Sequence, residues 1–371
     1  MKTKMRIAML GHKRIPSREG GIEIVVEELS TRMVKKGHEV TVYNRRGHHV
    51  SGADYQSVDE YKGVKVKSVW TLDKKGLAAL TSSISAALKT SFGKYDVVHI
   101  HAEGPAAMAW LPHFFHKRVI VTVHGLDWAR AKWGGFATKY IKWGEKEAVK
   151  RADEIIVLSR GVQDYFEKTY GRKTEFIPNG VDKPEIREAA EIKKQWGLEK
   201  DSYVLFLGRL VPEKGIRYLV DAWKRIHTDK KLVIAGGSSD TQAFMDELKA
   251  AAGDDVIFTG FQQGRVLEEL YSNAYIYCLP SDLEGMPLSL LEAMSYGNCC
   301  VVSDIAECAE VVEDKAVAFP KGNVEELRKT LQRLLDEPEI VATYKSEAAE
   351  YIVKKYNWDD VVDKTLELYK G

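Results

Sequence analysis

Two successive series of short aliphatic runs, separated by longer amphipathic stretches, constrain the fold of this chain more than any other feature. The expected strands of the first series are Ile7–Leu10, Glu39–Tyr43, Val97–His101, Val119–Val123 and Ile155–Leu158, with helical patterns such as Glu23–Lys36 and Lys139–Arg151 between some of them. Those of the second series are Tyr203–Leu207, Lys231–Ala235, Val256–Phe258, Ile276–Leu279 and Cys300–Ser303. Because strands that alternate with helices form parallel sheets, the pattern predicts two Rossmann-like α/β domains.

Residues 177–184 are the expected connection between the two domains, because this segment holds two prolines and an Asn-Gly pair. We therefore place a first domain at residues 1–182 and a second at residues 183–354. Ligands of open parallel sheets bind beyond the carboxyl ends of the strands. The residues that directly follow strands are accordingly the candidates for function.

The composition excludes several classes of protein. No window approaches the roughly 18 unbroken apolar residues of a membrane span, and Met1–Lys4 leads straight into a strand, so we expect a cytoplasmic protein. The four cysteines lack the spacing of a zinc site and are expected to be reduced, buried thiols. Residues 1–180 hold 31 Lys and Arg against 19 Asp and Glu, whereas residues 181–371 hold 24 against 35. The basic first half indicates either an anionic partner, such as a phospholipid surface or a lipid-linked diphosphate, or solvated lysines on helix faces.

Two polar clusters follow strands of the first domain. Gly20 and Gly21 precede a helix, where the absence of a Cβ would let a phosphate approach the free N–H groups, although such a pair can also be an ordinary loop. Their spacing is not the GxGxxG of dinucleotide-binding proteins, so a nicotinamide or flavin enzyme gains no support. His124 and Asp127 follow the strand 119–123, and a histidine there contacts a ligand or simply hydrogen-bonds to its neighbours.

Two cations follow the first strand of the second domain. Gly208 and Arg209 come directly after the strand 203–207, and Lys214 precedes a helical run. The planar fork of arginine and the point charge of lysine suit a leaving diphosphate, whereas solvated loop cations are the alternative.

The stretch 280–294 is the most specific part of the chain. If a helix begins near Pro287, Glu284 lies in the preceding loop and Glu292 lies more than one turn inside the helix. Both carboxylates could then accept hydrogen bonds from hydroxyl groups of one ligand, while loop N–H groups face it. Glu292 could instead be one more surface glutamate.

Taken together, four elements resemble the retaining glycosyltransferases of family 4, which have the GT-B fold of two Rossmann-like domains facing across a deep cleft. The elements are Gly20-Gly21-x-Glu23, His124-Gly125, Arg209 with Lys214-Gly215, and Glu284-x7-Glu292. The resemblance covers essentially the whole chain. It implies that residues 355–371 form a helix that crosses back to the first, acceptor-side domain, and that the second domain binds a nucleotide sugar.

The resemblance also implies the roles of single residues. Arg209, Lys214 and Gly21 would hold the donor diphosphate, His124 and Glu284 would contact the donor sugar, and Glu292 would bind the ribose. The implied catalytic residues are His124, Arg209, Lys214 and Glu284. The implied donor-binding residues are Gly20, Gly21, Gly208, Arg209, Lys214, Glu284, Gly285, Met286, Pro287, Leu288 and Glu292. Glu23 and Asp127 are the expected acceptor contacts.

Members of this family are similar in retaining the anomeric configuration, with an oxygen of the leaving diphosphate helping to remove the acceptor proton. No cofactor is expected, and the absence of an Asp-x-Asp motif gives no support to a bound metal. The spacing Gly11-x4-Pro16-x3-Gly20-Gly21 is similar to a bacterial subgroup linked to rhamnose-containing or related surface polysaccharides. The expected reaction is transfer of a hexose or deoxyhexose from a UDP or dTDP sugar to a lipid-linked glycan.

Residues 128–143 mix aromatic and cationic side chains, which predicts peripheral contact with an anionic membrane or, alternatively, packed tryptophans with outward lysines. Two other functions stay open: a nucleotide-sugar 2-epimerase type of enzyme and a non-catalytic nucleotide-sugar-binding partner. Nucleic acid is not an expected partner, because the basic residues form no recognisable reading motif.

Overall fold

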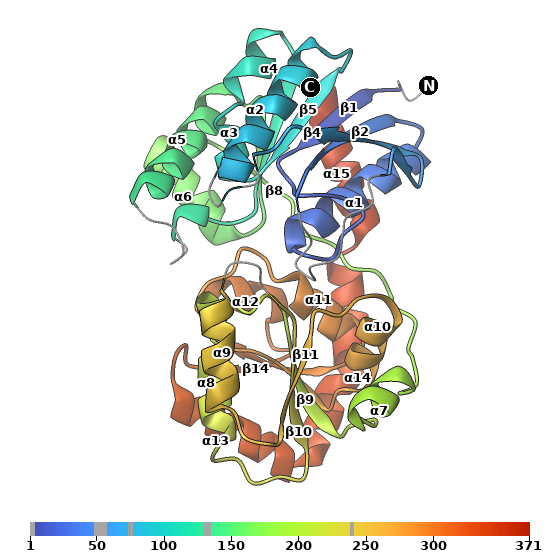
Figure 1. Ribbon diagram of the computed structural model, residues 1–371, viewed down its shortest axis with the longest axis vertical. Helices are drawn as coiled ribbons and strands as arrows, with labels where there is room; N and C mark the ends of the chain where they lie inside the picture. The colour runs from blue at the N-terminus through green and yellow to red at the C-terminus, as the bar shows by residue number, and fades with distance from the viewer. Residues whose placement is uncertain (1–3, 48–57, 73, 75–76, 130–134, 238–240) are drawn as a thin grey trace. The chain divides into compact units, whose positions relative to one another are not determined.

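The computed structural model describes residues 4–47, 58–72, 74, 77–129, 135–237 and 241–371 (Figure 1). Contacts divide the chain into two compact units, Met1–Asn179 with Trp358–Gly371, and Gly180–Asn357. The boundaries expected from the sequence, after residue 182 and before residue 355, each differ from these by three residues. The chain therefore passes between the units twice.

The first unit is built on a sheet with the strand order β3-β4-β2-β1-β5-β6-β7-β8, in which β3 is antiparallel to β4 and all other pairs are parallel. Its strands are β1 (Arg6–Leu10), β2 (Glu39–Arg45), β3 (Glu60–Tyr61), β4 (Val64–Val69), β5 (Val97–His101), β6 (Arg118–Val123), β7 (Glu154–Val157) and β8 (Glu175–Phe176). Its helices are α1 (Gly21–Lys35), α2 (Leu77–Phe92), α3 (Glu103–Ala106), α4 (Trp110–Phe114), α5 (Gly135–Arg151), α6 (Arg160–Tyr170) and α15 (Trp358–Lys370), with a 3₁₀ turn at Asp127–Ala129. Figure 1 shows α2 to α6 on one side of this sheet and α1 with α15 on the other.

The central strands β5 and β6 are buried almost throughout, which explains their nearly unbroken aliphatic sequences. The core between this sheet and its helices includes Ile100, Val121 and Phe166, each of which is fully buried. Because β1 lies between β2 and β5, the strand order reverses beside it. Loops at the carboxyl ends of β1, β5 and β6 therefore flank the switch point where open α/β sheets bind ligands.

The second unit has a fully parallel sheet with the order β11-β10-β9-β12-β13-β14. Its strands are β9 (Tyr203–Leu207), β10 (Lys231–Ala235), β11 (Val256–Gly260), β12 (Ile276–Leu279), β13 (Cys299–Ser303) and β14 (Val317–Phe319). Its helices are α7 (Glu191–Trp196), α8 (Ile216–Trp223), α9 (Gln242–Ala251), α10 (Gly264–Asn273), α11 (Leu288–Ser295), α12 (Ala306–Val312), α13 (Val324–Asp336) and α14 (Pro338–Lys355), with a 3₁₀ turn at Pro212–Lys214. The order again reverses at β9, whose neighbours are β10 and β12.

Helix α15 completes the first unit although it follows the whole second unit in sequence. Tyr369 donates or accepts a hydrogen bond with His99 of β5 at 2.6 Å, and Arg118 of β6 donates to the carbonyl oxygen of Leu368 at 2.7 Å. Arg32 and Lys36, at the end of α1, form ion pairs with carboxylates of α15. The expected final helix thus belongs to the first unit.

All four cysteines are buried and unbridged. None of the described helices is both long and apolar enough to cross a membrane.

Candidate donor site and the carboxyl edges of the two sheets

The loops after β9 and β12 are joined to each other at the carboxyl edge of the second sheet. The backbone N–H of Asp282 donates to the carbonyl oxygen of Glu213 at 2.9 Å. Gly215 has a φ of +64°, and a Cβ at this position would lie 1.9 Å from the carbonyl oxygen of Pro280. Only glycine allows this close approach. The segments around Lys214 and Glu284 therefore lie together in one site, because they follow the adjacent strands β9 and β12.

Lys214 and Glu284 form a buried ion pair in these loops. The Nζ atom of Lys214 lies 2.6 Å and 2.8 Å from the two carboxylate oxygens of Glu284, and the side chains are only 13% and 6% exposed. Ser281 donates a further hydrogen bond to Glu284 at 2.6 Å. The pair holds the ammonium group at the strand ends, where its remaining hydrogen-bonding capacity can meet an anion. Arg209 follows β9 at the same edge and is half-buried.

The loop 285–287 leads directly into helix α11. The helix begins at Leu288 with Pro287 as its N-cap. Pro287 therefore lies one position outside the helix, whereas the sequence predicted it in the first turn. No side chain caps this helix start. Its backbone N–H groups are consequently suited to a ligand acceptor atom.

Glu292 lies inside α11 and is held by Tyr271, whose hydroxyl donates to its carboxylate at 3.1 Å. Tyr271 is 1% exposed and also contacts the carbonyl oxygen of Ser289 at 3.3 Å. Glu292 is only partly exposed, which distinguishes it from an ordinary surface glutamate. Its carboxylate is therefore fixed in direction before any ligand binds.

In the first unit, Gly20 is the N-cap of α1, and the helix begins at Gly21. No side-chain hydrogen bond caps this helix start either, and a Cβ at Gly20 would lie 2.5 Å from a carboxylate oxygen of Glu23. Glu23 is buried and accepts a hydrogen bond from the backbone N–H of Lys13 at 2.8 Å. Its carboxylate thus folds back onto the loop after β1, a structural task that the sequence did not indicate.

Sequence reasoning missed a chain of buried histidines beside His124. His99 contacts Thr122 at 2.7 Å, its ring stacks on that of His101, and His101 lies 3.1 Å from the Nε2 atom of His124. Burial lowers the pKa of His99 to about 3 and that of His101 well below its ordinary value, with neighbouring histidines adding to the effect. These two rings are therefore neutral at physiological pH, and His101 fixes the orientation of His124.

Glu103, at the start of α3, is a second residue that sequence reasoning missed. It is fully buried and accepts a hydrogen bond from the backbone N–H of Asp127 at 2.8 Å, while its Oε1 atom has no hydrogen-bond partner among the described residues. Burial, with Asp127 and Glu145 nearby, raises the pKa of Glu103 well above its ordinary value. Polar residues in alternation along 99–103, at the end of a strand, were the available signal.

The aromatic and cationic stretch 128–143 is only partly a surface, and residues 130–134 lie outside the described residues. Trp128 donates from its indole nitrogen to Glu145 at 3.1 Å, and Lys142 lies over its ring. Phe136 and Trp143, in contrast, are 85% and 42% exposed. Trp128 is therefore held by neighbours within the unit, and membrane contact of this stretch stays a prediction.

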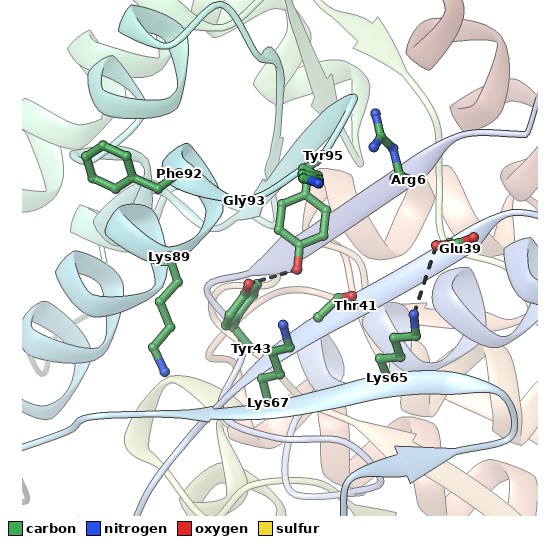
Figure 2. A pocket seen from close by; sticks show the side chains of 11 residues that line it. Arg6, Glu39, Thr41, Tyr43, Lys65, Lys67, Lys89, Phe92, Gly93 and Tyr95 are labelled. Atoms are coloured by element: carbon green, nitrogen blue, oxygen red, sulfur yellow. Dashed lines mark hydrogen bonds and ion pairs between the residues drawn. The ribbon is translucent and has the colours of Figure 1, made fainter.

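A cavity of about 620 Å³ lies at the opposite, amino edge of the first sheet, away from all the motifs above (Figure 2). Arg6 and Glu39 begin the strands β1 and β2 there, and Tyr43 and Tyr95 are joined through their hydroxyls at 2.9 Å. The cavity is lined by Arg6, Glu39, Thr41, Tyr43, Lys65, Lys67, Lys89, Phe92, Gly93, Lys94 and Tyr95. Five of these side chains are basic and one is acidic.

Within the described ranges, no group of three or more histidine, cysteine, aspartate or glutamate side chains is arranged to hold a metal ion.

Comparison with known proteins identifies the class of protein to which the chain belongs. Residues 19–184 match the family model for Glycosyltransferase Family 4, and residues 188–351 match that for Glycosyl transferases group 1. The chain is therefore an enzyme of the glycosyltransferase class. More narrowly, it belongs to the glycosyltransferases with the GT-B fold, in which the two matched regions are the two Rossmann-like domains.

Similar curated proteins cover nearly the whole chain. An uncharacterized glycosyltransferase of Methanocaldococcus jannaschii is 26% identical, with 99% of this chain and 98% of the relative aligned. The alpha-maltose-1-phosphate synthase of Mycolicibacterium smegmatis is 25% identical, with 99% of each chain aligned.

Two solved structures share the fold. Sucrose-phosphate synthase from Thermosynechococcus elongatus superposes with a TM-score of 0.84 at 21% identity, covering 99% of this chain and 98% of that one. The Anabaena protein HepE, solved with UDP and glucose, superposes with a TM-score of 0.82 at 18% identity, covering 98% of both chains.

Proposed function

We propose that the chain transfers a hexose or deoxyhexose from a UDP or dTDP sugar, with retention of anomeric configuration and without a metal ion, to a lipid-linked glycan in surface polysaccharide assembly. The single observation that carries the donor site is the Lys214–Glu284 pair at the switch point of the second sheet. A buried ammonium group held at the carboxyl end of a strand is suited to the diphosphate of a sugar donor. HepE, which shares the fold, was solved with UDP and glucose, and this supports a nucleotide-sugar donor.

The proposed roles are those that the family resemblance implies for these residues, and the contacts described above support them. Lys214 and Arg209 neutralise the negative charge that grows on the leaving diphosphate as the bond between the anomeric carbon and the phosphate oxygen breaks. The acceptor hydroxyl bonds to the anomeric carbon on the same face, and its proton passes to an oxygen of the leaving diphosphate. Glu292 accepts hydrogen bonds from the ribose, because Tyr271 directs its carboxylate. His124 contacts the sugar, oriented by His101.

The acceptor is proposed from the charge of the first half of the chain. The first half of the chain carries the basic excess, which favours an acceptor with phosphate groups. Alpha-maltose-1-phosphate synthase and sucrose-phosphate synthase are named for phosphorylated disaccharides, so a soluble sugar phosphate is the acceptor to compare with a lipid-linked glycan.

Calorimetric titration with UDP, dTDP, GDP and ADP in the presence of EDTA tests the donor site. We expect one diphosphate to bind despite the chelator, and Arg209→Ala to weaken that binding by about 2 kcal/mol. Arg217→Ala is the matched control, because Arg217 is an exposed arginine of the same unit that pairs with Glu247. Absence of binding by all four nucleotides, or an equal loss in both variants, would refute the donor site.

Turnover tests the acceptor and the stereochemistry. With the donor named by calorimetry, release of the nucleotide is measured with a lipid-linked glycan and with a sugar phosphate, and the anomeric configuration of the product is read by NMR. An inverted product would refute retention, and turnover with the sugar phosphate alone would refute the lipid-linked acceptor.

A further inference from the structure

Helix α2 of the first unit has its apolar side chains on the outside. The side chains buried against the sheet are small or hydroxylic, namely Ser82, Ser83, Ala86, Ala87, Thr90 and Ser91. The hydroxyls of Ser83 and Ser91 donate to carbonyl oxygens one turn earlier in the same helix, at 2.6 Å and 2.7 Å. The outward residues Leu77, Ile84, Leu88 and Phe92 are between 39% and 71% exposed. An amphipathic helix of a soluble domain normally has the reverse arrangement, with its apolar stripe toward the core.

The exposed apolar side chains continue from α2 onto its neighbours. Phe92 contacts Phe115 with a distance of 4.6 Å between ring centroids, and Phe114 beside it is 71% exposed. Eleven large hydrophobic residues are exposed among the described residues, and eight of them lie on α2, α4 and α5. The second unit contributes one, Ile186. Helix α4 contacts both α2 and α5, and Figure 1 shows the three helices on one side of the sheet, so their outer sides form one face.

The same face is strongly basic. Helices α2 and α4 contain no acidic residue, and α5 contains five basic and two acidic residues, of which Glu145 is fully buried. Lys89, Lys94, Lys139 and Lys146 are exposed, and none of them forms an ion pair with another described residue. Lysines around exposed aromatic and aliphatic groups are typical of surfaces that lie in the interface of an anionic membrane.

The cavity at the amino edge opens beside the end of α2, and Figure 2 shows Lys89 and Phe92 on its rim. Arg6 in this cavity is neutralised by Asp96 at 2.7 Å, and Lys65 lies 4.0 Å from Glu39. Lys67, Lys89 and Lys94 have no such partner among the described residues. Three unneutralised ammonium groups beside an exposed phenylalanine match a negatively charged headgroup with its acyl chains nearby.

We propose that the outer side of α2, α4 and α5, termed here the α2–α4–α5 face, docks on an anionic phospholipid bilayer, with a lipid headgroup in the cavity at the end of α2. The proposal deepens the proposed function and rests on it for its biological role, because docking brings the enzyme to a membrane that carries the acceptor. Helix α2 begins after the carboxyl end of β4 and ends before the amino end of β5, so a membrane along α2 extends toward the edge that holds His124.

A second copy of the chain fits this face less well than a bilayer does. A symmetric dimer would place the same basic side chains opposite each other, and like charges across an interface disfavour association. An anionic bilayer offers the opposite charge together with an apolar layer for Phe92 and Phe114. The charge complementarity therefore favours lipid as the occupant.

Co-sedimentation of the full chain with vesicles tests the proposal. The probes are vesicles that mix phosphatidylglycerol with phosphatidylcholine, and vesicles of pure phosphatidylcholine. We expect binding to the mixed vesicles and much less to the neutral ones, because the lysines contribute only where the surface is negative. Lack of binding to the mixed vesicles would overturn the proposal.

Two pairs of substitutions locate the surface. Phe92→Ser with Phe114→Ser, and Lys89→Glu with Lys94→Glu, should each lower partitioning onto mixed vesicles by about ten-fold or more. Their controls lie in the second unit. Ile186→Ser changes an apolar position that is 62% exposed, against 71% for each phenylalanine, and Lys200→Glu with Lys249→Glu makes the same change in net charge. Equal losses in the controls, or full binding in both test pairs, would overturn the assignment of this face.

Analytical ultracentrifugation distinguishes the remaining occupant. A dimer that the two serine substitutions dissociate, without vesicle binding by the native chain, would assign the face to a second copy and overturn the membrane proposal. Titration of the native chain and of every variant with UDP, dTDP, GDP and ADP distinguishes failure of the docking surface from failure of the donor site. Nucleotide binding without vesicle binding refutes only the docking surface, and vesicle binding without nucleotide binding refutes only the donor site.

Discussion

Replacing Lys214 by methionine should separate the contribution of its ion pair to stability from its contribution to nucleotide binding. Methionine keeps most of the length of the side chain but removes the charge. Glu284 is then left only 6% exposed, with the hydrogen bond that Ser281 donates to it. Removing one partner of a buried ion pair costs about 3 to 5 kcal/mol, since the remaining charge stays desolvated.

The size of the effect can be worked out for the second unit, which spans residues 180–357. For a domain of this size, each kcal/mol lowers the melting temperature by roughly 2 to 4 °C, so the Lys214→Met variant should melt about 6 to 20 °C lower. Adding Glu284→Gln removes the stranded charge and should recover most of this loss. The double variant should still bind UDP about 10- to 100-fold more weakly than the native chain, because a hydrogen bond to a charged group contributes about 1.5 to 3 kcal/mol.

Thermal unfolding by calorimetry gives the melting temperatures, and isothermal titration gives the affinities. A Lys214→Met variant that melts like the native protein would show that the pair is not desolvated as described. Recovery of nucleotide affinity in the double variant would show that Lys214 does not contact the diphosphate. Either result would refute the reasoning.

Three further predictions concern single positions. Gly215→Ala should lower the unfolding free energy by at least about 2 kcal/mol, because the new Cβ would clash with the carbonyl oxygen of Pro280. Gly197→Ala, which has a similar φ of +67° but no atom close to the new Cβ, should lower it less. Urea unfolding compares the two variants, and equal losses would contradict the clash. Because the pKa of Glu103 is raised in the folded state, its protonated form stabilises the fold below pH 4.5, and this stability is lost as the pH rises toward the folded-state pKa. Above pH 4.5, the unfolding free energy of Glu103→Gln should therefore increase relative to that of the native protein by up to about 1.4 kcal/mol per pH unit. A difference in melting temperature that stays constant across this pH range would contradict the prediction. Burial lowers the pKa of His12 to about 4, so the neutral ring stabilises the fold fully above pH 6.5 and this stability is lost as the pH falls. Between pH 7 and pH 4, His12→Gln should therefore lose about 3 kcal/mol less unfolding free energy than the native protein. Unfolding free energies with the same pH dependence in both proteins would contradict this.

The sequence predicted the architecture well where periodicity and loop chemistry act locally. The strand 203–207 was predicted with its bounds, and a helical run was predicted after Lys214, because aliphatic runs and glycine residues specify both without help from distant residues. Strand β4 was missed although Val64, Val66 and Val69 are buried and the intervening lysines are exposed. Its alternating pattern was present in the sequence. Strands β3, β8 and β14, of only two or three residues, carry too little pattern to recognise.

The candidate site could be predicted in its positions but not in its contacts. Lys214 and Glu284 were named separately, and their ion pair became visible only once β9 and β12 were neighbours in one sheet. His99 was missed because its partners are remote: Thr122 lies 23 residues away and Tyr369 lies 270 residues away. Glu103 was missed for the same reason, since Asp127, which donates to it, lies 24 residues away. The alternation of polar residues along 99–103 was a local signal, but it does not show which distant groups contact these side chains.

The position of α15 also determines the order in which this protein can be made. Residues 358–371 are translated after every residue of the second unit, yet they supply Tyr369 to His99 and a carbonyl oxygen to Arg118. On the ribosome, the second unit can fold before the first is complete, because residues 180–357 are all synthesised before residues 358–371. Until α15 is made, that side of the first unit's sheet is covered by α1 without its partner helix. Loss of these few residues would therefore damage the half of the enzyme that is synthesised earliest.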